Sequence, residues 1–500
     1  MSYCIAKDGS KLADAYVKEL VLTAEFEVAH FIVSKYICKR EIAGHHLKII
    51  NHGESAEKTL QLCPRGHGKS TIGNVDYSIT KLLRDSNIRI LICSKTQTQG
   101  EAFLKEIRTH FEANEDLIRV FGDLKGDKWS DKEFNLKTRT VIKKEANVSA
   151  LGASGQVVSK HYDVIICDDL VSFENARTQG QRTKLKEWFY SSLEPTLEPG
   201  GLMKVIGTRY HPSDIYQDFI DLGSYSVCKQ QALNTYTEEE FGSWKARGLL
   251  PSSIQPGDTF PLWEYFGMNN LIERKRASGS IIFGMQFQND TDQAKGNIFK
   301  NEYLQYYESF VVRKDGKVDV FVKNEETGEL LRKTCRVYMG VDLAISQSAS
   351  ADYFVIAVVG RDDDNNYYVL EYYMDKISFD KQINKILEYG QVKYPGVERI
   401  GIEAVAYQAA MGQHLRRYSN LPVIDIKTHK DKITRAMQLS AKFENGKVYL
   451  KSDMAYLIDQ LLLFPETSDG HDDAYDAVEF AISMGEEKNK IKVVNTNLYI

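Results

Sequence analysis

The strongest constraint on the fold is a glycine-rich stretch within residues 57–71, which follows a short apolar run. The run stops at Pro64, and Gly66, Gly68, Lys69 and Ser70 follow. Glycines let backbone N–H groups turn inward around a polyphosphate, while the lysine neutralises its charge and the serine hydroxyl ligates Mg²⁺. A helix opening at Lys69 adds the positive end of its dipole. The stretch predicts a strand, a nucleotide-binding loop and a helix start, although Cys63 takes the slot where the GxxxxGKS pattern has its first glycine. The residues expected to bind the nucleotide are Pro64, Arg65, Gly66, His67, Gly68, Lys69, Ser70 and Thr71.

Two adjacent carboxylates follow a second apolar strand, at Asp168 and Asp169. Carboxylates at the carboxyl end of a parallel strand face the ligand crevice of the sheet. In a P-loop ATPase one acid holds Mg²⁺ and the next polarises the attacking water, a task given more often to glutamate. The alternative is an ordinary Asp-Asp turn. We interpret Asp168 as a Mg²⁺ ligand beside Ser70, and Asp169 as catalytic.

A later strand leads to Thr208, which we expect to sense the γ-phosphate, and to Arg209, which could touch phosphate or DNA.

The composition predicts two large domains. The chain has 500 residues, 43% of them hydrophobic and 27% charged, which is enough apolar surface for two cores. No stretch has the length of a membrane span and the N-terminus lacks a signal-peptide pattern, so we expect a cytoplasmic protein. Seven scattered cysteines without a CxxC pair predict reduced thiols. The net charge of −5 gives no overall attraction to DNA, which leaves any DNA contact to local basic patches.

Alternating strands and helices organise the first half of the chain. Helical spacing within residues 1–55 predicts an N-terminal helical segment. Residues 56–233 then predict a P-loop ATPase domain with a mostly parallel sheet covered by helices. Residues 234–330 read as a connector, whose aromatic side chains are expected to pack rather than stack on bases.

The second half has the order of a ribonuclease H-like domain, predicted over residues 331–487, with a tail over 488–500. Three strands, at residues 337–344, 353–360 and 367–373, form a predicted antiparallel meander, and helix-separated strands follow at 399–403 and 422–426.

Acidic residues fall where this fold would bring them together. Asp342 lies in the middle of the first expected strand, Glu403 ends the fourth, and Asp473 and Asp476 lie one turn apart on the last helix, with Asp472 adjacent. Carboxylates from separate elements repel one another unless divalent metal ions lie between them, so the cluster predicts a two-metal nuclease site. The alternative for Asp472 and Asp473 is that they only begin a helix.

Six motifs in this order resemble the large subunit of tailed-phage terminases. They are Pro-Arg-Gly-His-Gly-Lys-Ser at 64–70, Val-Ile-Ile-Cys-Asp-Asp at 164–169, Gly-Thr-Arg at 207–209, Gly-Val-Asp at 340–342, Ile-Glu-Ala-Val-Ala-Tyr-Gln at 402–408 and His-Asp-Asp-Ala-Tyr-Asp-Ala at 471–477. The resemblance implies that Arg65 stabilises charge on the γ-phosphate and that Asp169 replaces the usual catalytic glutamate. The stretch with Lys432 and Arg435 is similar to a basic helix beside the nuclease cleft, which implies that both cations grip the DNA backbone.

The resemblance also implies cofactors and partners. These are ATP and Mg²⁺, with Mn²⁺ able to substitute in the nuclease, double-stranded DNA, the portal protein of a procapsid, the terminase small subunit, and further copies of the chain in a ring on the portal. No membrane partner is expected, and the site of action would be the host cell cytoplasm. Two rival readings stay open: a helicase-like repair nuclease, which would carry further helicase motifs, and a non-enzymatic nucleotide-binding scaffold.

Overall fold

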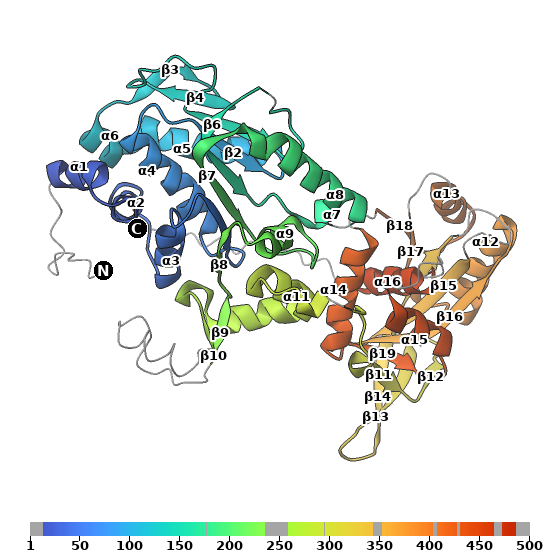
Figure 1. Ribbon diagram of the computed structural model, residues 1–500. Helices are drawn as coiled ribbons and strands as arrows, with labels where there is room; N and C mark the ends of the chain where they lie inside the picture. The colour runs from blue at the N-terminus through green and yellow to red at the C-terminus, as the bar shows by residue number, and fades with distance from the viewer. Residues whose placement is uncertain are drawn as a thin grey trace, which may run out of the picture. The chain divides into compact units, whose positions relative to one another are not determined.

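The computed structural model describes residues 14–157, 159–176, 178–235, 259–294, 296–343, 353–403, 408–427, 431–464 and 473–486, without the side chains of 293, 408–410 and 473. The chain divides into two compact units. Within the described residues, the first unit runs to Lys275 and includes Ser280 to residue 294, and the second comprises Arg276–Gly279 and the residues from Gly296 onward (Figure 1). Because Arg276–Gly279 belongs to the second unit and Ser280 to the first, the chain crosses between the units within the segment predicted as a connector.

The first unit is built on a mostly parallel sheet, which confirms the predicted fold class. Strands β5, β2, β6, β7, β1 and β8 are parallel, and β4 and β3 continue the sheet in antiparallel pairing. In sheet order the strands are β3 (Lys125–Trp129), β4 (Glu133–Leu136), β5 (Val148–Gly152), β2 (Ile90–Ser94), β6 (Tyr162–Asp168), β7 (Leu197–Gly207), β1 (Lys58–Leu62) and β8 (Ser226–Lys229). Strand β7 therefore separates β1 from β6.

Helices cover both faces of this sheet, and alternating strand residues divide between two cores. In β6, Val164 and Ile166 join a core with α1–α6, while Ile165 and Cys167 join one with α8 and α9. The helices are α1 (Asp14–Thr23), α2 (Phe26–Ile32), α3 (Gly44–His52), α4 (Tyr77–Arg84), α5 (Gln97–Ala113), α6 (Glu115–Phe121), α7 (Phe173–Ala176), α8 (Gln179–Trp188) and α9 (Ile215–Leu222). Because α1 to α3 share the core of the sheet, they are integral to this unit.

A helix and a small hairpin complete the first unit. Strands β9 (Leu233–Thr235) and β10 (Thr259–Pro261) pair antiparallel, and α11 (Met268–Gln288) follows. Helix α11 is broken at Gly279, whose φ of 77° is open to glycine, and ends at Asn289 in the left-handed conformation. Phe283 and Phe287 of α11 are buried with Leu271 and Ala232, which agrees with the packing role expected for the connector aromatics.

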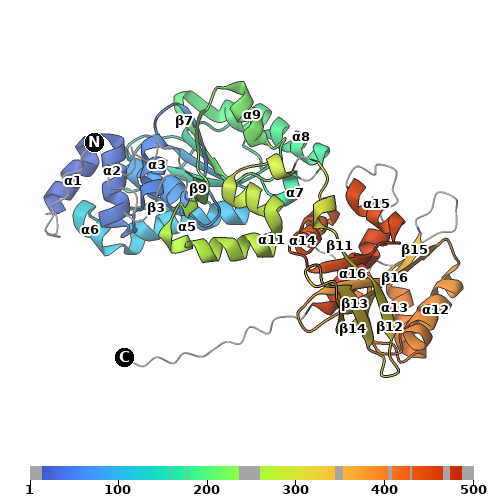
Figure 2. The same ribbon diagram turned by 90° about the horizontal axis from the view of Figure 1, so that it is seen from below.

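The second unit contains the strand order of a ribonuclease H-like fold, as predicted. Strands β16 (Tyr367–Asp375), β15 (Phe354–Arg361) and β14 (Leu330–Asp342) are antiparallel, and β14, β17 (Val397–Glu403) and β18 (Val423–Ile426) are parallel. Further strands extend the sheet, namely β11 (Gln305–Tyr307), β12 (Ser309–Val312), β13 (Val318–Lys323) and β19 (Val448–Lys451). The helices, labelled in Figure 2, are α12 (Phe379–Leu387), α13 (Gln408–Tyr418), α14 (Lys432–Glu444), α15 (Ala455–Leu463) and α16 (Asp473–Gly485).

Helix α16 packs directly on the central strands of this sheet. A Cβ added to Gly340 of β14 would lie 2.1 Å from the carbonyl oxygen of Ala477 and 2.4 Å from the nitrogen of Ala481. Only glycine at this position lets the helix backbone approach the strand so closely. The Gly340-Val-Asp motif therefore has a packing function in addition to presenting Asp342.

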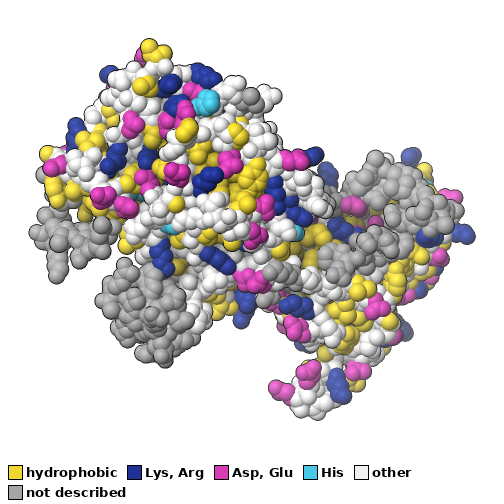
Figure 3. All heavy atoms as spheres, in the orientation of Figure 1, with side chains coloured by type: hydrophobic (Ala, Val, Ile, Leu, Met, Phe, Trp, Pro, Cys, Tyr) yellow, Lys and Arg dark blue, Asp and Glu magenta, His cyan; other side chains and the backbone are white. Residues whose placement is uncertain are grey.

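Side-chain chemistry agrees with the sequence on two further points. All six cysteines in the described part of the chain are free thiols. Basic and acidic side chains are interspersed over the face shown in Figure 3, as the small net charge suggests. Among the helices of the described ranges, none is both long and apolar enough to cross a membrane.

Candidate functional site

The loop after β1 has the conformation that its glycines predict. Gly66 and Gly68 have φ values of 80° and 74°, and Lys69 and Ser70 begin a helical segment that continues through a π-helical turn, Thr71–Asp76, into α4. A Cβ at Gly66 would lie 2.9 Å from the ring of Phe266, and one at Gly68 would lie 2.7 Å from Nε2 of His46. Both positions therefore need glycine for conformation and for space. The predicted sequence of strand, loop and helix is present.

The ends of β1 and β6 bring four of the predicted residues together. The Ser70 hydroxyl donates to Oδ1 of Asp168 at 2.9 Å, and Nζ of Lys69 lies 3.0 Å from Oδ2 of Asp169. Asn74 Nδ2 donates to the other Asp168 oxygen at 3.0 Å. Each carboxylate of the Asp-Asp pair thus faces one residue of the loop's Lys-Ser pair.

Burial governs the electrostatics of this cluster. Loss of solvent, followed by the neighbouring Asp169 charge, raises the pKa of Asp168 to about 7, against the lowering effects of Lys69, Asn74 and Ser70. Burial acts to lower the pKa of Lys69, but Asp169 and Asp168 outweigh it and the net shift is upward. The lysine is therefore charged, and its charge favours the ionised form of Asp168.

Asp169 also has an unusual backbone. Its φ is 50°, in the left-handed region that residues other than glycine, asparagine and aspartate seldom adopt. Its N–H donates to the carbonyl oxygen of Ile206 on β7 at 2.9 Å. This conformation turns the chain sharply at the strand end, and such backbone strain is concentrated at functional sites.

The segment after β7 places Thr208 and Arg209 in different roles. Thr208 is buried directly after the strand that lies between β1 and β6. The Arg209 guanidinium is 3.1 Å from Oδ2 of Asp214 and also donates to the side chain of Gln217 and to the carbonyl oxygens of His211 and Pro212. Arg209 is therefore engaged in the turn before α9, and the expectation that it touches phosphate or DNA gains no support from the structure.

Arg65 and His67 tie the loop to the segment after β10. The Arg65 guanidinium donates to Oε1 of Gln286 at 3.0 Å. The buried His67 ring stacks on Phe266, with ring centroids 4.7 Å apart. Burial lowers the pKa of His67 to about 4, so this ring is neutral at physiological pH. Sequence reasoning identified the loop side of these contacts but missed Gln286.

Two predicted nuclease acids lie at neighbouring strand ends in the second unit. Val341 of β14 is in register with Ile402 of β17, so Asp342 and Glu403 are the next residues on adjacent parallel strands, which lie about 4.8 Å apart. Asp342 is the last residue of β14 and not, as the sequence suggested, in the middle of a strand. The sequence reading placed the strand end two residues too late because Leu343 and Ala344 continue the apolar run. The strand-end position is the better one for a ligand.

Asp476 on α16 is held by the two cations that were predicted to bind DNA. Nζ of Lys432 lies 2.5 Å from one Asp476 oxygen, and Arg435 Nη2 lies 2.9 Å from the other. Arg435 Nη1 reaches Glu479 at 2.6 Å. The side chain of Arg435 is 12% exposed and that of Lys432 is 28% exposed. The sequence did not predict that Lys432 and Arg435 form ion pairs with Asp476, an acid of the predicted nuclease group.

The metal-binding prediction stays a prediction. In the described part of the chain, no three or more histidine, cysteine, aspartate and glutamate side chains are grouped so that they could hold a metal ion. Asp472 lies outside the described residues, and Asp473 is described only by its backbone at the start of α16. The chemistry of the remaining donors, carboxylate oxygens at the ends of two adjacent strands, suits Mg²⁺ or Mn²⁺.

Comparison with known proteins agrees with this arrangement. A family model described as the terminase RNaseH-like domain matches residues 339–485. The terminase large subunit of Enterobacteria phage T3 is 28% identical over 258 residues, covering 48% of this chain and 42% of that protein. The chain is therefore similar to phage terminase large subunits, and the similarity to their RNaseH-like domain covers residues 339–485. The matched region spans less than half of the T3 relative.

Solved structures of phage terminases are also similar to this chain. One crystal form of the large terminase of a thermophilic bacteriophage is 9% identical, covers 89% of this chain and 99% of that chain, and has a TM-score of 0.48. The large terminase nuclease of the thermophilic phage G20c with bound magnesium is 16% identical, covers 38% of this chain and 97% of that chain, and has a TM-score of 0.27.

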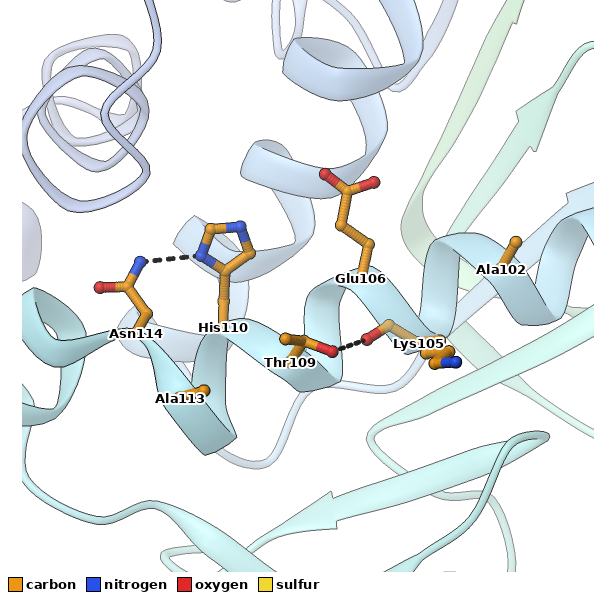
Figure 4. Close-up of a pocket in the computed structure, with 7 residues that line it drawn as sticks. All are labelled: Ala102, Lys105, Glu106, Thr109, His110, Ala113 and Asn114. Carbon is orange, nitrogen blue, oxygen red and sulfur yellow. Dashed lines mark hydrogen bonds between the residues drawn. The ribbon is translucent and has the colours of Figure 1, made fainter. Parts of the chain in front are cut away.

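A pocket in the first unit is separate from the predicted sites. It has a volume of about 480 Å³ and lies along α5, where Asn114 donates to the His110 ring at 2.8 Å (Figure 4). Its lining residues are Ala102, Lys105, Glu106, Thr109, His110, Ala113 and Asn114. None of them belongs to the predicted nucleotide or nuclease residues.

Proposed function

We propose that the chain is the motor and nuclease subunit of a viral DNA-packaging machine. ATP hydrolysis in the first unit drives double-stranded DNA into a procapsid, and a two-metal endonuclease in the second unit cuts concatemeric DNA. The observation that carries the proposal is the matched pair of contacts at the phosphate loop: Ser70 with Asp168, and Lys69 with Asp169. It is supported by the match of residues 339–485, in the same chain as this loop, to the terminase RNaseH-like domain.

In the proposed ATPase site each residue has a distinct task. The loop N–H groups from Gly66 to Ser70 bind the phosphates, and Lys69 balances their charge. Ser70 and Asp168 would hold Mg²⁺, since both are hard oxygen donors already within hydrogen-bond distance of each other; the ion would supply charge neutralisation at the phosphates. Asp169 orients the attacking water, Arg65 stabilises charge on the γ-phosphate, and Thr208 senses it.

In the proposed nuclease site Asp342, Glu403 and Asp476, with Asp473 and Asp472 from the same stretch, would hold Mg²⁺ or Mn²⁺, which activates water against a phosphodiester. Lys432 and Arg435 neutralise Asp476 in the structure described here. Both cations lie beside this acid, and in the proposed function they contact the phosphates of bound DNA.

The partners follow from the same proposal. The chain binds double-stranded DNA, the portal protein and the small terminase subunit, and assembles as a ring on the portal in the host cell cytoplasm. Mixing the protein with DNA, ATP and empty procapsids, and then measuring the DNA protected from added nuclease, tests the packaging role. Turnover of ATP without protected DNA, in the presence of a competent portal, would favour the repair-nuclease alternative.

Asp169→Asn should retain ATP binding and lower turnover by about a hundredfold or more, the scale of a lost general base. The amide keeps the shape of the side chain but loses the charge that faces Lys69. Steady-state ATPase kinetics and nucleotide-binding titrations measure the two effects separately. The matched control is Asp163→Asn on the same strand, an acid paired with Arg89 at 2.7 Å. Equal losses of binding and turnover in Asp169→Asn would assign this acid to the metal shell instead.

Lys432→Ala combined with Arg435→Ala should weaken duplex binding and flatten its dependence on salt by up to about two units of slope, because each phosphate contact contributes about one. Fluorescence anisotropy with a DNA duplex over a series of salt concentrations gives the slope. Lys442→Ala is the control on the same helix, since this lysine is similarly exposed and pairs with Glu486 at 2.8 Å. A double variant with the parental slope would place both cations away from DNA.

A further inference from the structure

The last turn of α11 holds the phosphate loop by a residue that no motif includes. Gln286 is buried, and it contacts Arg65 twice: its main-chain oxygen accepts from the Arg65 N–H at 3.0 Å, and its Oε1 accepts from the Arg65 guanidinium at 3.0 Å. The main chain and the guanidinium of Arg65 are therefore both held by one residue that lies 221 positions away in sequence.

The same turn holds the other segments that border the loop. Asn289 is fully buried and its Oδ1 accepts from the N–H of Arg209, next to Thr208, at 3.3 Å. Its Nδ2 donates to the carbonyl oxygen of Gln230 at 2.9 Å. The N–H of Gln230 in turn donates to the carbonyl oxygen of Leu62, the last residue of β1, at 2.8 Å. One helix end thus contacts the loop arginine and the segment that follows β7, and reaches the end of β1 through Gln230.

We propose that Gln286 is a positioning residue for ATP hydrolysis, which acts by holding the Arg65 guanidinium in one orientation. The inference rests on the proposed ATPase function. A free arginine side chain has many rotamers, and this rotamer entropy must be lost when the guanidinium stabilises charge in a transition state. An arginine that is ordered beforehand by a buried acceptor loses less, so the contact favours the transition state and not ground-state binding.

The side chain of Gln286 is suited to this task. It is nine-tenths or more buried, so its amide is held by the surrounding helix, whereas the Arg65 side chain that it contacts is exposed at the loop. Phe283 and Phe287 of the same turn are also buried, in a small core with Leu271 and Ala232 that anchors the helix end. A fixed acceptor, Oε1 of Gln286, therefore contacts a donor with many rotamers, the Arg65 guanidinium, and this contact can preorganise the arginine.

Gln286→Met keeps the unbranched shape but removes the acceptor, and should lower kcat of ATP hydrolysis about tenfold, the equivalent of one lost positioning hydrogen bond, with KM for ATP within about twofold of the parent. Gln288→Met is the matched control, because Gln288 lies two residues away and its amide instead bonds the main chain of Leu233, donating and accepting at 2.9 Å. That variant loses two hydrogen bonds and should keep kcat within about twofold. Steady-state kinetics on the full chain, with melting temperatures for each variant, provide the comparison.

Gln286→Glu is the second variant, since a carboxylate accepts the same hydrogen bond, and it should keep kcat within about threefold of the parent. Equal loss of kcat in Gln286→Met and Gln288→Met would reveal a merely structural role and overturn the proposal. So would a rise in kcat, which would mean that Gln286 restrains Arg65, or a tenfold loss in Gln286→Glu. Absence of ATP turnover in the parent protein would instead refute the proposed function itself.

Discussion

Replacing Lys69 by alanine should abolish ATP hydrolysis. Lys69 is buried and its ammonium lies 3.0 Å from Asp169, so the substitution removes the cation from a site that must accept a polyphosphate. The loss also acts on the neighbouring acid: Lys69 lowers the pKa of Asp168, which burial and Asp169 already raise to about 7. Without the lysine, the Asp168 pKa rises further and the carboxylate becomes protonated near neutral pH. One substitution therefore removes a proposed phosphate ligand and weakens the proposed Mg²⁺ ligand beside it.

The measurement is steady-state ATP turnover beside Mn²⁺-dependent nicking of plasmid DNA. We expect the first activity to vanish and the second to persist, because the nuclease acids lie on another unit of the chain. Lys58→Ala is the matched control, a lysine on the strand before the loop that pairs with Glu194 at 2.6 Å. Removing one partner of a largely buried ion pair destabilises a protein, so Lys69→Met, which retains the bulk of the stem, is measured in parallel. Parental turnover in both variants would show that this loop does not bind ATP.

The local structure of the proposed nucleotide site was predictable from the sequence, because nearby residues determine it. Gly66 and Gly68 adopt the positive φ values that the loop pattern demands, and Asp168 and Asp169 follow a strand whose apolar run is unmistakable. Asn74, which binds Asp168, was missed although it lies four residues after Ser70, on the same helical face. That spacing was the available signal. No comparable sequence signal identified Gln286, because a glutamine in a helix gives no indication that it contacts a residue 221 positions away.

The second unit was predictable in order but less so in detail. Strands β14 to β18 are long or strongly apolar, and their order predicted the ribonuclease H-like arrangement. Short or amphipathic strands such as β12 and β13 were assigned to a connector, because each can be recognised only through its pairing with the start of β14. The ion pairs of Asp476 were also beyond reach, since α14 and α16 lie about forty residues apart and their facing sides are set by tertiary packing.

Those ion pairs change the expected energetics of the nuclease site without its metals. Four carboxylates brought together would have to take up protons, and the apo site would be strained. Lys432 and Arg435 instead balance Asp476, and Arg435 reaches Glu479 as well. Burial raises the pKa of Glu479, while Arg435 acts to lower it. Asp342 and Glu403 remain as two acids at the ends of neighbouring strands.

Asp342→Ala should therefore eliminate DNA cleavage, spare ATP turnover, and leave the free energy of unfolding in metal-free buffer unchanged or slightly raised. Loss of cleavage is expected because this strand-end carboxylate beside Glu403 is a proposed metal ligand. The small effect on stability follows because the substitution removes one of two adjacent acids. Plasmid cleavage in Mg²⁺ and in Mn²⁺, Mn²⁺ titration calorimetry and chemical denaturation measure the three effects.

Asp319→Ala is the control for a strand-borne acid of the same sheet. Asp319 is nearly buried on β13 and accepts a hydrogen bond from Thr334 at 2.7 Å, so its loss should lower stability and leave cleavage intact. Comparison of the two variants distinguishes a residue that stabilises the fold, as expected for Asp319, from one that is needed for cleavage, as expected for Asp342. Cleavage by Asp342→Ala at the parental rate in either metal, or undiminished Mn²⁺ binding, would refute the nuclease assignment, whereas a large fall in stability would show that Asp342 belongs to the packing of β14 against its neighbours.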